Sequence, residues 1–342
     1  MTPGLGARPR PSIRDVARLA EVSHQTVSRV LNDHQSIRPA TRQRVLDAMA
    51  ELNFTPSRVA RMLATSRTYT VGVLATVSGT YYGPTSAISA IEDAARDAGY
   101  STLLASPRNV DATGLSDAIE YLIREGVEGI VVLAPQTLTA KAMAQARHPV
   151  PVVMMQPDSQ DADPGLSVDN EAGGALAAQH LWELGHRRLA LVAGPADWAE
   201  AGARRRGFEK GLAAVGARPV AVAGGDWSAE SGYAAFARIA GSGFTGVFCA
   251  NDQMALGVMH AASDCGLRLP GDLSLVGFDD VPEAAHYRPP LTTLRQEFDI
   301  IGRRAIGALL ARVQGDPVAR DEPVRPQMIV RASTTPPRAS AP

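Results

Sequence analysis

The chain of 342 residues has little cysteine and no long hydrophobic run. Its two cysteines, Cys249 and Cys265, exclude a disulfide framework and favour a reducing compartment. No stretch of about 18 consecutive apolar residues occurs, which argues against a transmembrane helix. The N-terminal stretch MTPGLGARPRPSIRDV lacks the apolar segment of a secretory signal. Together these absences lead us to expect a cytoplasmic protein without membrane partners.

Motifs for enzymatic chemistry are also missing. The sequence has no Walker P-loop, no HExxH motif and no phosphate-cradling GxGxxG after its first expected strand. Its histidines do not follow a metal-ligand spacing; five of them are His148, His180, His186, His260 and His286. We therefore expect a non-enzymatic protein, with no catalytic residues, no metal site and no cofactor.

Charge is divided unevenly along the chain. Residues 1–68 carry eleven arginines and five acidic residues, whereas the remainder carries 23 basic and 30 acidic residues. A basic first fifth on an acidic body indicates an appended anion-binding module, with nucleic acid as the first candidate and a solvated basic tail as the alternative. The length suggests two or three domains.

The basic segment has the pattern of a helix-turn-helix. One apolar face in residues 13–20 comprises Ile13, Val16, Ala17 and Ala20. Ser23 is expected to cap a second short helix, whose apolar stripe is Val27, Val30 and Leu31. A third helix is expected to begin near Pro39 and to bury Val45, Ala48, Met49 and Leu52. His24, Gln25 and Arg29 fall opposite the second stripe, where they could reach base edges.

The runs DVARLAEVSHQTVSRVLN and TRQRVLDAMAELNFTPSRVARML resemble the DNA-binding headpiece of the LacI/GalR family of bacterial repressors. Two positions depart from the family pattern. Glu21 stands where the family usually has Gly, which costs roughly 1 kcal/mol if that turn is left-handed. Arg38 replaces the usual Ser that caps the third helix. The resemblance implies DNA contacts at these headpiece positions: Ser12, Ile13, Arg14, Ser23, His24, Gln25, Thr26, Ser28, Arg29, Asn32, Arg38 and Thr41.

The segment after Pro56 resembles the family's hinge helix, although the sequence alone favours a plain linker helix. Ser57 is placed to cap it, with Ala60 at a small-residue position and Leu63 at a wedge position. The resemblance implies that two such helices pair in the minor groove and insert Leu63 at a central base step, which kinks DNA. Because a helix this short is marginal alone in water, it suits a switch.

From Tyr69 onward, short apolar runs alternate with helical stretches that end at or near Gly. This alternation predicts doubly wound parallel α/β units, and its restart after residue 166 predicts two lobes with a cleft between them. The family implies three chain crossings between the lobes, near Pro164, Gln296 and Pro326. The expected organisation is a flexible tail (1–11), the helix-turn-helix domain (12–56), the hinge (57–68), a bilobal core of the periplasmic-binding-protein type (69–335) and a disordered tail (336–342). Lobe 1 comprises about 69–164 and 297–325, and lobe 2 about 165–296 and 326–335.

The cleft is expected to bind a sugar. Carboxylates accept from vicinal hydroxyls, Arg and Asn donate, and an aromatic face covers the C–H side of a sugar ring. Arg204, Trp227, Asn251 and Asp279 qualify because they lie at or just beyond the ends of expected strands. Each has a structural alternative: a solvated arginine run, a core tryptophan, a helix cap at Asn251-Asp252 (with Asp252 as the favoured cap) and a turn at Asp279.

The family resemblance covers about residues 12–335, and its densest blocks include ANDQMALGVM, GLRLPGDLSLVGFDD and YRPPLTTLRQEF. It implies effector contacts at the four residues above and at Gln296 and Phe298. The first-lobe side differs from the family member it most resembles: Gln156 replaces Asp, Glu200 replaces Ser, and Tyr81-Tyr82 replace a smaller wall.

We therefore expect a sugar-responsive repressor that binds a palindromic operator as a homodimer and is released by a sugar or glycoside. The alternative is a cytoplasmic sugar-binding or sugar-processing protein without DNA function. The C-terminal TTPPRASAP has no heptads, so no helical oligomerisation tail is expected.

Overall fold

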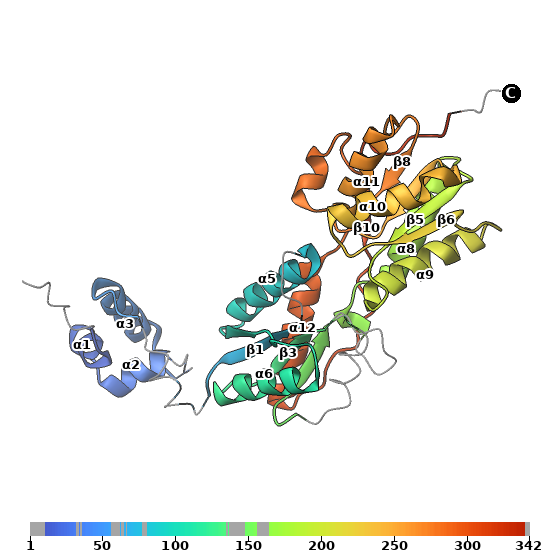
Figure 1. Ribbon diagram of the computed structural model, residues 1–342. Helices are drawn as coiled ribbons and strands as arrows, with labels where there is room; N and C mark the ends of the chain where they lie inside the picture. The colour runs from blue at the N-terminus through green and yellow to red at the C-terminus, as the bar shows by residue number, and fades with distance from the viewer. Residues whose placement is uncertain are drawn as a thin grey trace, which may run out of the picture. The chain divides into compact units, whose positions relative to one another are not determined.

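The chain folds into two compact units, residues 1–68 and 69–342 (Figure 1). The structure is a computed structural model, and it describes residues 11–31, 34, 36–55, 62, 65, 67–76, 81–134, 136, 148–155 and 164–338. The hinge positions Ser57, Ala60 and Leu63, together with Asn32 and Gln156, lie outside these described residues. The predictions made for them therefore stay predictions.

The first unit is built from three helices. These are α1 (Ile13–Leu19), α2 (His24–Leu31) and α3 (Pro39–Glu51). Each contributes a fully buried valine to one small core: Val16 from α1, Val27 from α2 and Val45 from α3. The apolar spacing in the sequence therefore identified the inward faces correctly, because residues three and four apart share one side of a helix.

The start of each headpiece helix follows a different rule. Ser12 caps α1 through a reciprocal capping box with Asp15. Ser23 precedes α2 and accepts from the Thr26 amide at 3.1 Å, so the predicted cap is present. Arg38 occupies the N-cap of α3 but forms no side-chain cap, since an arginine side chain has no acceptor. Glu21 has φ 52°, which confirms that the α1–α2 turn requires a left-handed residue.

The second unit begins with a parallel sheet in the order β2-β1-β3-β4. Its strands are β1 (Thr70–Ala75), β2 (Ser101–Ala105), β3 (Ile130–Leu133) and β4 (Val152–Met155). Helices α5 (Tyr82–Asp97) and α6 (Ala112–Arg124) come from the same stretch of chain, whereas α12 (Phe298–Gln314) returns from far along it to pack against α5 and β4. We refer to this sheet and its helices as lobe 1.

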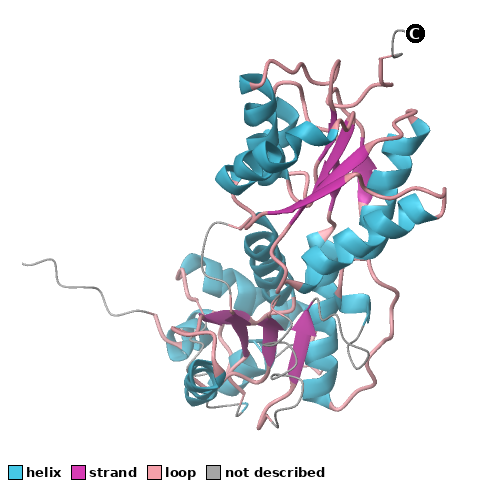
Figure 2. Cartoon of the chain, turned by 45° about the vertical axis from the view of Figure 1, so that its right-hand side comes forward, coloured by secondary structure: helices cyan, strands magenta, loops and turns pink. Residues whose placement is uncertain are grey.

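A second parallel sheet has the equivalent order, β6-β5-β7-β8, and forms lobe 2. Its strands are β5 (Leu189–Ala193), β6 (Ala221–Gly224), β7 (Gly246–Cys249) and β8 (Ser274–Val276). Its helices are α8 (Asn170–Glu183), α9 (Ala199–Ala213), α10 (Ala229–Ile239) and α11 (Asp252–Asp264). In both lobes the helices lie on both faces of the strands, as Figure 2 shows. This is the doubly wound arrangement that the sequence predicted.

Short elements complete the second unit. Strands β9 (Thr293–Arg295) and β10 (Gln327–Ile329) pair in antiparallel fashion beside lobe 2. The described residues also include short 3₁₀ helices: η1 (Pro164–Leu166), η2 (Ala240–Ser242) and η3 (Pro282–His286).

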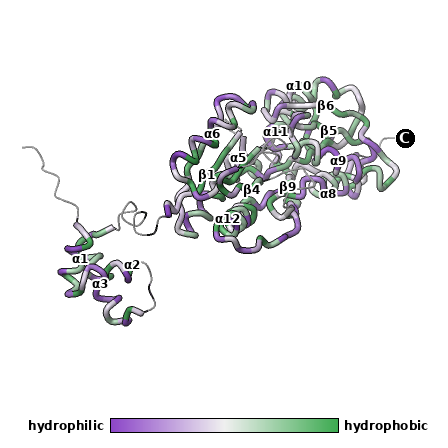
Figure 3. Tube along the Cα trace, turned by 90° about the horizontal axis from the view of Figure 1, so that it is seen from below, coloured by the Kyte–Doolittle hydropathy of each residue, from purple (hydrophilic) through white to green (hydrophobic). Residues whose placement is uncertain are grey.

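Hydrophobic and hydrophilic stretches alternate along the helices in Figure 3, as expected for helices that bury one face. None of the described helices is long and apolar enough to cross a membrane.

Two glycines let α8 and α9 approach closely, and this contact sets the position of Arg204. A Cβ on Gly174 would lie 2.1 Å from the Arg204 carbonyl oxygen, and one on Gly207 would lie 1.8 Å from the Glu171 carbonyl oxygen. Both distances are far below van der Waals contact. Only glycine therefore permits this crossing, which places the inner face of α9 at the edge of the lobe 2 sheet.

Candidate functional site

The first unit presents a polar face on α2. His24, Gln25 and Arg29 are exposed, while Val27 and Val30 on the opposite side are buried. The residues predicted to contact bases therefore share the outward side of the helix. Their contact with DNA is a prediction that the isolated headpiece geometry permits.

Other predicted headpiece contacts have structural duties as well. The Ser12 and Ser23 hydroxyls are engaged in helix capping, and Ser23 Oγ lies 2.9 Å from Thr26 Oγ1. Ile13 is half-buried against the helix core rather than fully outward. Arg14 and Arg38 are exposed, while Ser28 and Thr41 are half-buried.

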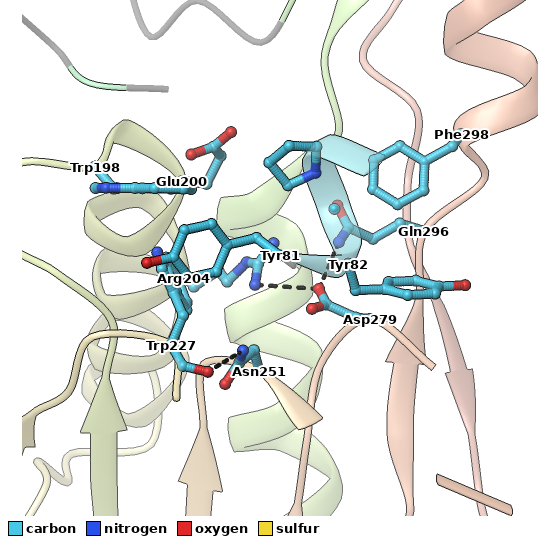
Figure 4. A pocket seen from close by; sticks show the side chains of 12 residues that line it. Tyr81, Tyr82, Trp198, Glu200, Arg204, Trp227, Asn251, Asp279, Gln296 and Phe298 are labelled. Atoms are coloured by element: carbon cyan, nitrogen blue, oxygen red, sulfur yellow. Dashed lines mark hydrogen bonds and ion pairs between the residues drawn. The ribbon is translucent and has the colours of Figure 1, made fainter. Parts of the chain in front are cut away.

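A pocket in the second unit gathers residues from both lobes (Figure 4). The carboxyl ends of parallel strands meet at one edge of a sheet, and Trp227, Asn251 and Asp279 follow β6, β7 and β8 at this edge of lobe 2. Lobe 1 contributes residues at the beginnings of α5 and α12. The described lining consists of Tyr81, Tyr82, Gly83, Pro84, Trp198, Glu200, Arg204, Trp227, Asn251, Asp279, Gln296 and Phe298.

One wall of the pocket is aromatic. The Trp227 and Trp198 rings pack edge to face with centroids 5.4 Å apart, and Trp198 meets Tyr81 in the same way at 5.6 Å. A Cβ on Gly194 would lie 2.3 Å from the Trp227 ring, so glycine there makes room for the indole. Trp227 is 6% exposed, and its Nε1–H has no hydrogen-bond partner among the described residues. A buried donor of this kind is costly unless a ligand satisfies it.

Arg204 is the cation at the pocket floor. Its Nε donates to Asn170 Oδ1 at 2.8 Å, and its Nη1 donates to the Ala250 carbonyl and to Asp279 Oδ1 at 3.4 Å. The guanidinium also lies 3.7 Å from the centre of the Phe278 ring, a cation–π contact. Burial lowers the pKa of Arg204, whereas the nearby carboxylates of Asp279 and Glu200 raise it. Arginine nevertheless stays charged, because its unperturbed pKa is so high.

Asp279 faces Arg204 in an unusual backbone conformation. Its φ is 112°, and Trp227 across the pocket has φ 76°. Such strain in non-glycine residues gathers at functional sites. Burial raises the pKa of Asp279 to about 6, while Arg204 and the hydrogen bond from Gln296 act in the opposite direction. Gln296 Nε2 donates to Asp279 Oδ1 at 2.6 Å, and the buried Gln296 Oε1 has no partner within the described part of the chain.

The helix cap at the start of α11 is Asn251, so the expectation that Asp252 serves as the cap was wrong. Asn251 Oδ1 accepts from the Met254 amide at 2.9 Å, and its Nδ2 donates to the Trp227 carbonyl at 3.0 Å. Asp252 is fully buried and instead accepts from Thr293 and from the Val281 amide. Asn251 therefore lines the pocket and also holds the strained Trp227 segment in place.

The structure brings together every described residue that was predicted to contact the effector. Glu200 is buried at the second position of α9, and Phe298 is buried at the first position of α12. Sequence reasoning missed Trp198 as a site residue. Its signal was available, because it follows the expected strand RRLALVAG at the edge where the other site residues gather. The described lining offers two carboxylates, two amides, an arginine and aromatic faces, which can hydrogen-bond to a polar ligand and pack against its apolar side.

Comparison with known proteins identifies both units. Residues 12–57 match the model of bacterial regulatory proteins of the lacI family, and residues 178–334 match a periplasmic binding protein-like domain. The lactose operon repressor of Escherichia coli K12 is 36% identical over 327 residues, covering 95% of this chain and 90% of that protein. The chain belongs to the lacI family.

Other transcriptional regulators are similar along nearly the whole chain. A transcriptional repressor named PurR from Haemophilus influenzae (strain PittEE) is 33% identical, covering 94% of this chain and 98% of its own length. The crystal structure of the Lac repressor dimer bound to operator and an anti-inducer superposes with a TM-score of 0.80 at 35% identity, covering 96% of this chain and 100% of that one. A complex of the transcriptional regulator CelR with cellobiose superposes with a TM-score of 0.69 at 30% identity, covering 95% of this chain and 100% of that one. The predicted family and its two-part fold are therefore confirmed.

Proposed function

We propose that this protein is a transcriptional repressor that binds a near-palindromic operator as a homodimer and is released when a sugar or glycoside fills the pocket between its lobes. The observation that carries the proposal is that one chain joins an exposed polar face on α2 to a pocket with hydrogen-bonding groups and an aromatic wall. The proposal is supported by similarity to the operator-bound Lac repressor dimer and to the cellobiose-bound CelR, whose structures match 96% and 95% of this chain.

On the DNA side, His24, Gln25 and Arg29 read base edges, while Ser23, Thr26 and Ser28 mainly position α2 on phosphates. Arg29→Ala should weaken specific binding by roughly 1–3 kcal/mol and relax preference at one base pair. The measurement is a titration against the operator and against random DNA in parallel. An equal loss on both would make Arg29 a phosphate contact.

The hinge proposal rests on Leu63. Leu63→Ala should reduce operator affinity and DNA bending, because a wedge side chain acts only once DNA is bound. Its sugar affinity should equal that of the wild type. Unchanged bending in a circular-permutation gel shift would remove the wedge role.

On the effector side, Asp279 accepts hydrogen bonds from sugar hydroxyls, Arg204 donates to them, and Trp227 covers a ring face. Asp279→Asn is the cleaner variant, since Arg204→Ala would also strip Asn170 and the Ala250 carbonyl of a buried donor. Hydrogen bonds to charged groups contribute roughly 1.5–3 kcal/mol each. Asp279→Asn should therefore hold operator normally but need at least tenfold more sugar for release. Asp97→Asn, an exposed carboxylate at the far end of α5, is the matched control.

Release requires coupling between the two units. If sugar weakens operator binding a thousandfold, the operator-bound form must bind sugar a thousandfold less tightly, about 4 kcal/mol of coupling. Measuring sugar affinity with and without saturating operator tests this reciprocity. If the Asp279→Asn variant and the wild type were released from operator DNA at the same sugar concentration, the pocket would not be the sensor.

Two alternatives are separated by simple measurements. The PurR relatives favour a purine as a second candidate effector, and a thermal-shift panel of sugars and purine bases decides between them, because ligand bound to the native state raises Tm. A sugar-binding protein without DNA function would show no specific gel shift. The matched control is residues 69–342 alone, which form a compact unit of their own and should not shift operator DNA.

A further inference from the structure

The pocket continues into a larger groove between the lobes. The pocket itself encloses about 40 Å³, and the groove about 810 Å³. Since a cavity of roughly 10–15 Å³ admits one water, the inner pocket in this state has room for only a few waters. Tyr82, Asp279, Gln296 and Phe298 line both spaces, so the two adjoin at these residues.

Two buried polar atoms of the inner pocket have no partner among the described residues, and a ligand that both accepts and donates hydrogen bonds would satisfy them. Trp227 Nε1–H is an unsatisfied donor and Gln296 Oε1 an unsatisfied acceptor, on side chains 6% and 7% exposed. Both described hydrogen bonds to the Asp279 carboxylate end on Oδ1, which leaves Oδ2 for a ligand. A hydroxyl group can donate and accept at once, whereas an ionised phosphate oxygen has no proton and can only accept.

The groove carries an excess of negative charge. Among its described lining residues Arg295 is the one cation, and it is held by Asp280 at 2.7 Å. Within the described part of the chain, Glu283, Glu297 and Asp299 have no ion pair. The lining carboxylates are Asp93, Asp279, Asp280, Glu283, Glu297 and Asp299. No group of described side chains there is placed to hold a metal ion.

The positive groups nearest the junction of the two spaces are already balanced. Arg204 pairs with Asp279 and has further partners in Asn170 and Ala250. The N-termini of α9 and α12 would attract an anion, but Glu200 lies in the first turn of α9, and Asp299 in that of α12. A phosphorylated ligand would therefore meet carboxylates and, among the described lining residues, no cation without a carboxylate partner.

Aromatic faces line both spaces. Tyr81, Trp198 and Trp227 form the wall of the inner pocket, whereas the Tyr82 and Phe298 rings stand at the entrance to the groove (Figure 4). An aromatic face covers the C–H side of one sugar ring. Two separate faces in adjoining spaces therefore fit two linked rings.

We infer that the effector is an unphosphorylated saccharide of at least two rings, with one ring against the Trp227 wall and the next in the carboxylate-lined groove. This inference rests on the proposed sugar-released repressor and makes its ligand specific. The first ring enters as Tyr81 and the lobes move apart, and its hydroxyls satisfy Trp227 Nε1, Gln296 Oε1 and Asp279 Oδ2. The second ring gives its hydroxyls to the unpaired carboxylates.

Calorimetric titration of the full-length protein tests the inference with neutral disaccharides, their constituent monosaccharides, the disaccharide 6-phosphates and purine bases. At least one disaccharide should bind tenfold or more tightly than either constituent, and its 6-phosphate at least tenfold more weakly. Ser89 lines the groove but not the inner pocket, and it is exposed on α5. Ser89→Trp should therefore cost tenfold or more in disaccharide affinity and leave monosaccharide affinity unchanged, while Ser89→Ala changes neither.

The outcomes separate this inference from the proposed function. Equal binding of mono- and disaccharide, with no effect of Ser89→Trp, overturns the two-ring inference and leaves a sugar-released repressor. If the disaccharide 6-phosphate binds more tightly than the neutral disaccharide, only the claim that the effector is unphosphorylated is overturned. Binding of a purine base, or of no saccharide in the panel, overturns the proposed effector and the inference together.

Discussion

The raised pKa of Asp279 predicts that its carboxylate destabilises the native protein near neutral pH. Burial raises this pKa from 3.8 to about 6, so the folded state binds the proton more tightly than the unfolded state does. Well below pH 3.8 the group is protonated in both states and costs the protein no stability. As the pH rises from 3.8 towards 6, the free energy of unfolding falls, because the unfolded state ionises more readily. At 1.36 kcal/mol per pKa unit, the cost at pH 7 is about 3 kcal/mol.

Asp279→Asn removes this titration and retains an oxygen that can accept from Gln296. We expect the variant to exceed the wild type in free energy of unfolding by a margin that grows from pH 4 to pH 7, where it is on the order of 3 kcal/mol less whatever the lost ion pair with Arg204 contributes. All three tryptophans (Trp182, Trp198 and Trp227) lie in the second unit, so their fluorescence in a urea titration reports on that unit alone. A stability difference that is the same at both pH values would refute the reasoning.

Three further predictions concern the fold. Gly174→Ala should destabilise the second unit by roughly 3 kcal/mol or more, because its Cβ would lie 2.1 Å from a backbone oxygen of α9. Gly307→Ala is the matched control: this glycine is exposed in α12 with nothing within 4 Å of its Cβ position, so the change should stabilise the unit by about 1 kcal/mol. A urea titration of each variant measures the two effects. Arg38→Ser should slow amide exchange in α3 by adding a cap worth about 1 kcal/mol, and unchanged exchange would show that the α3 terminus is satisfied otherwise. Glu21→Gly should raise the headpiece Tm by relieving a left-handed cost of roughly 1 kcal/mol, offset in part by glycine's entropy; a lower Tm would mean that the entropy dominates.

The sequence by itself determined the elements and their inward faces. Periodicity is a property of neighbouring residues, so Val16, Val27 and Val45 could be assigned to the headpiece core before any coordinates. The alternation of apolar runs and helices ending at glycine likewise predicted two parallel sheets. Because strand ends gather at one edge of such a sheet, Trp227, Asn251 and Asp279 could be expected in a single cleft. The return of α12 to lobe 1 came from the family resemblance rather than from its own residues.

Only the tertiary structure decided how those side chains are used. Asn251 and Asp252 are adjacent and chemically similar, and it is the position of Val281 and Thr293 across the fold that draws Asp252 inward and leaves the cap to Asn251. The pKa of Asp279 depends on burial by segments far away in sequence. The continuity of the pocket with an acidic groove arises because α5 and α12 meet the loop after β8. Local pattern fixes which side of an element is apolar, but burial, charge balance and the space left for a ligand are set by contacts between residues that the chain brings together only on folding.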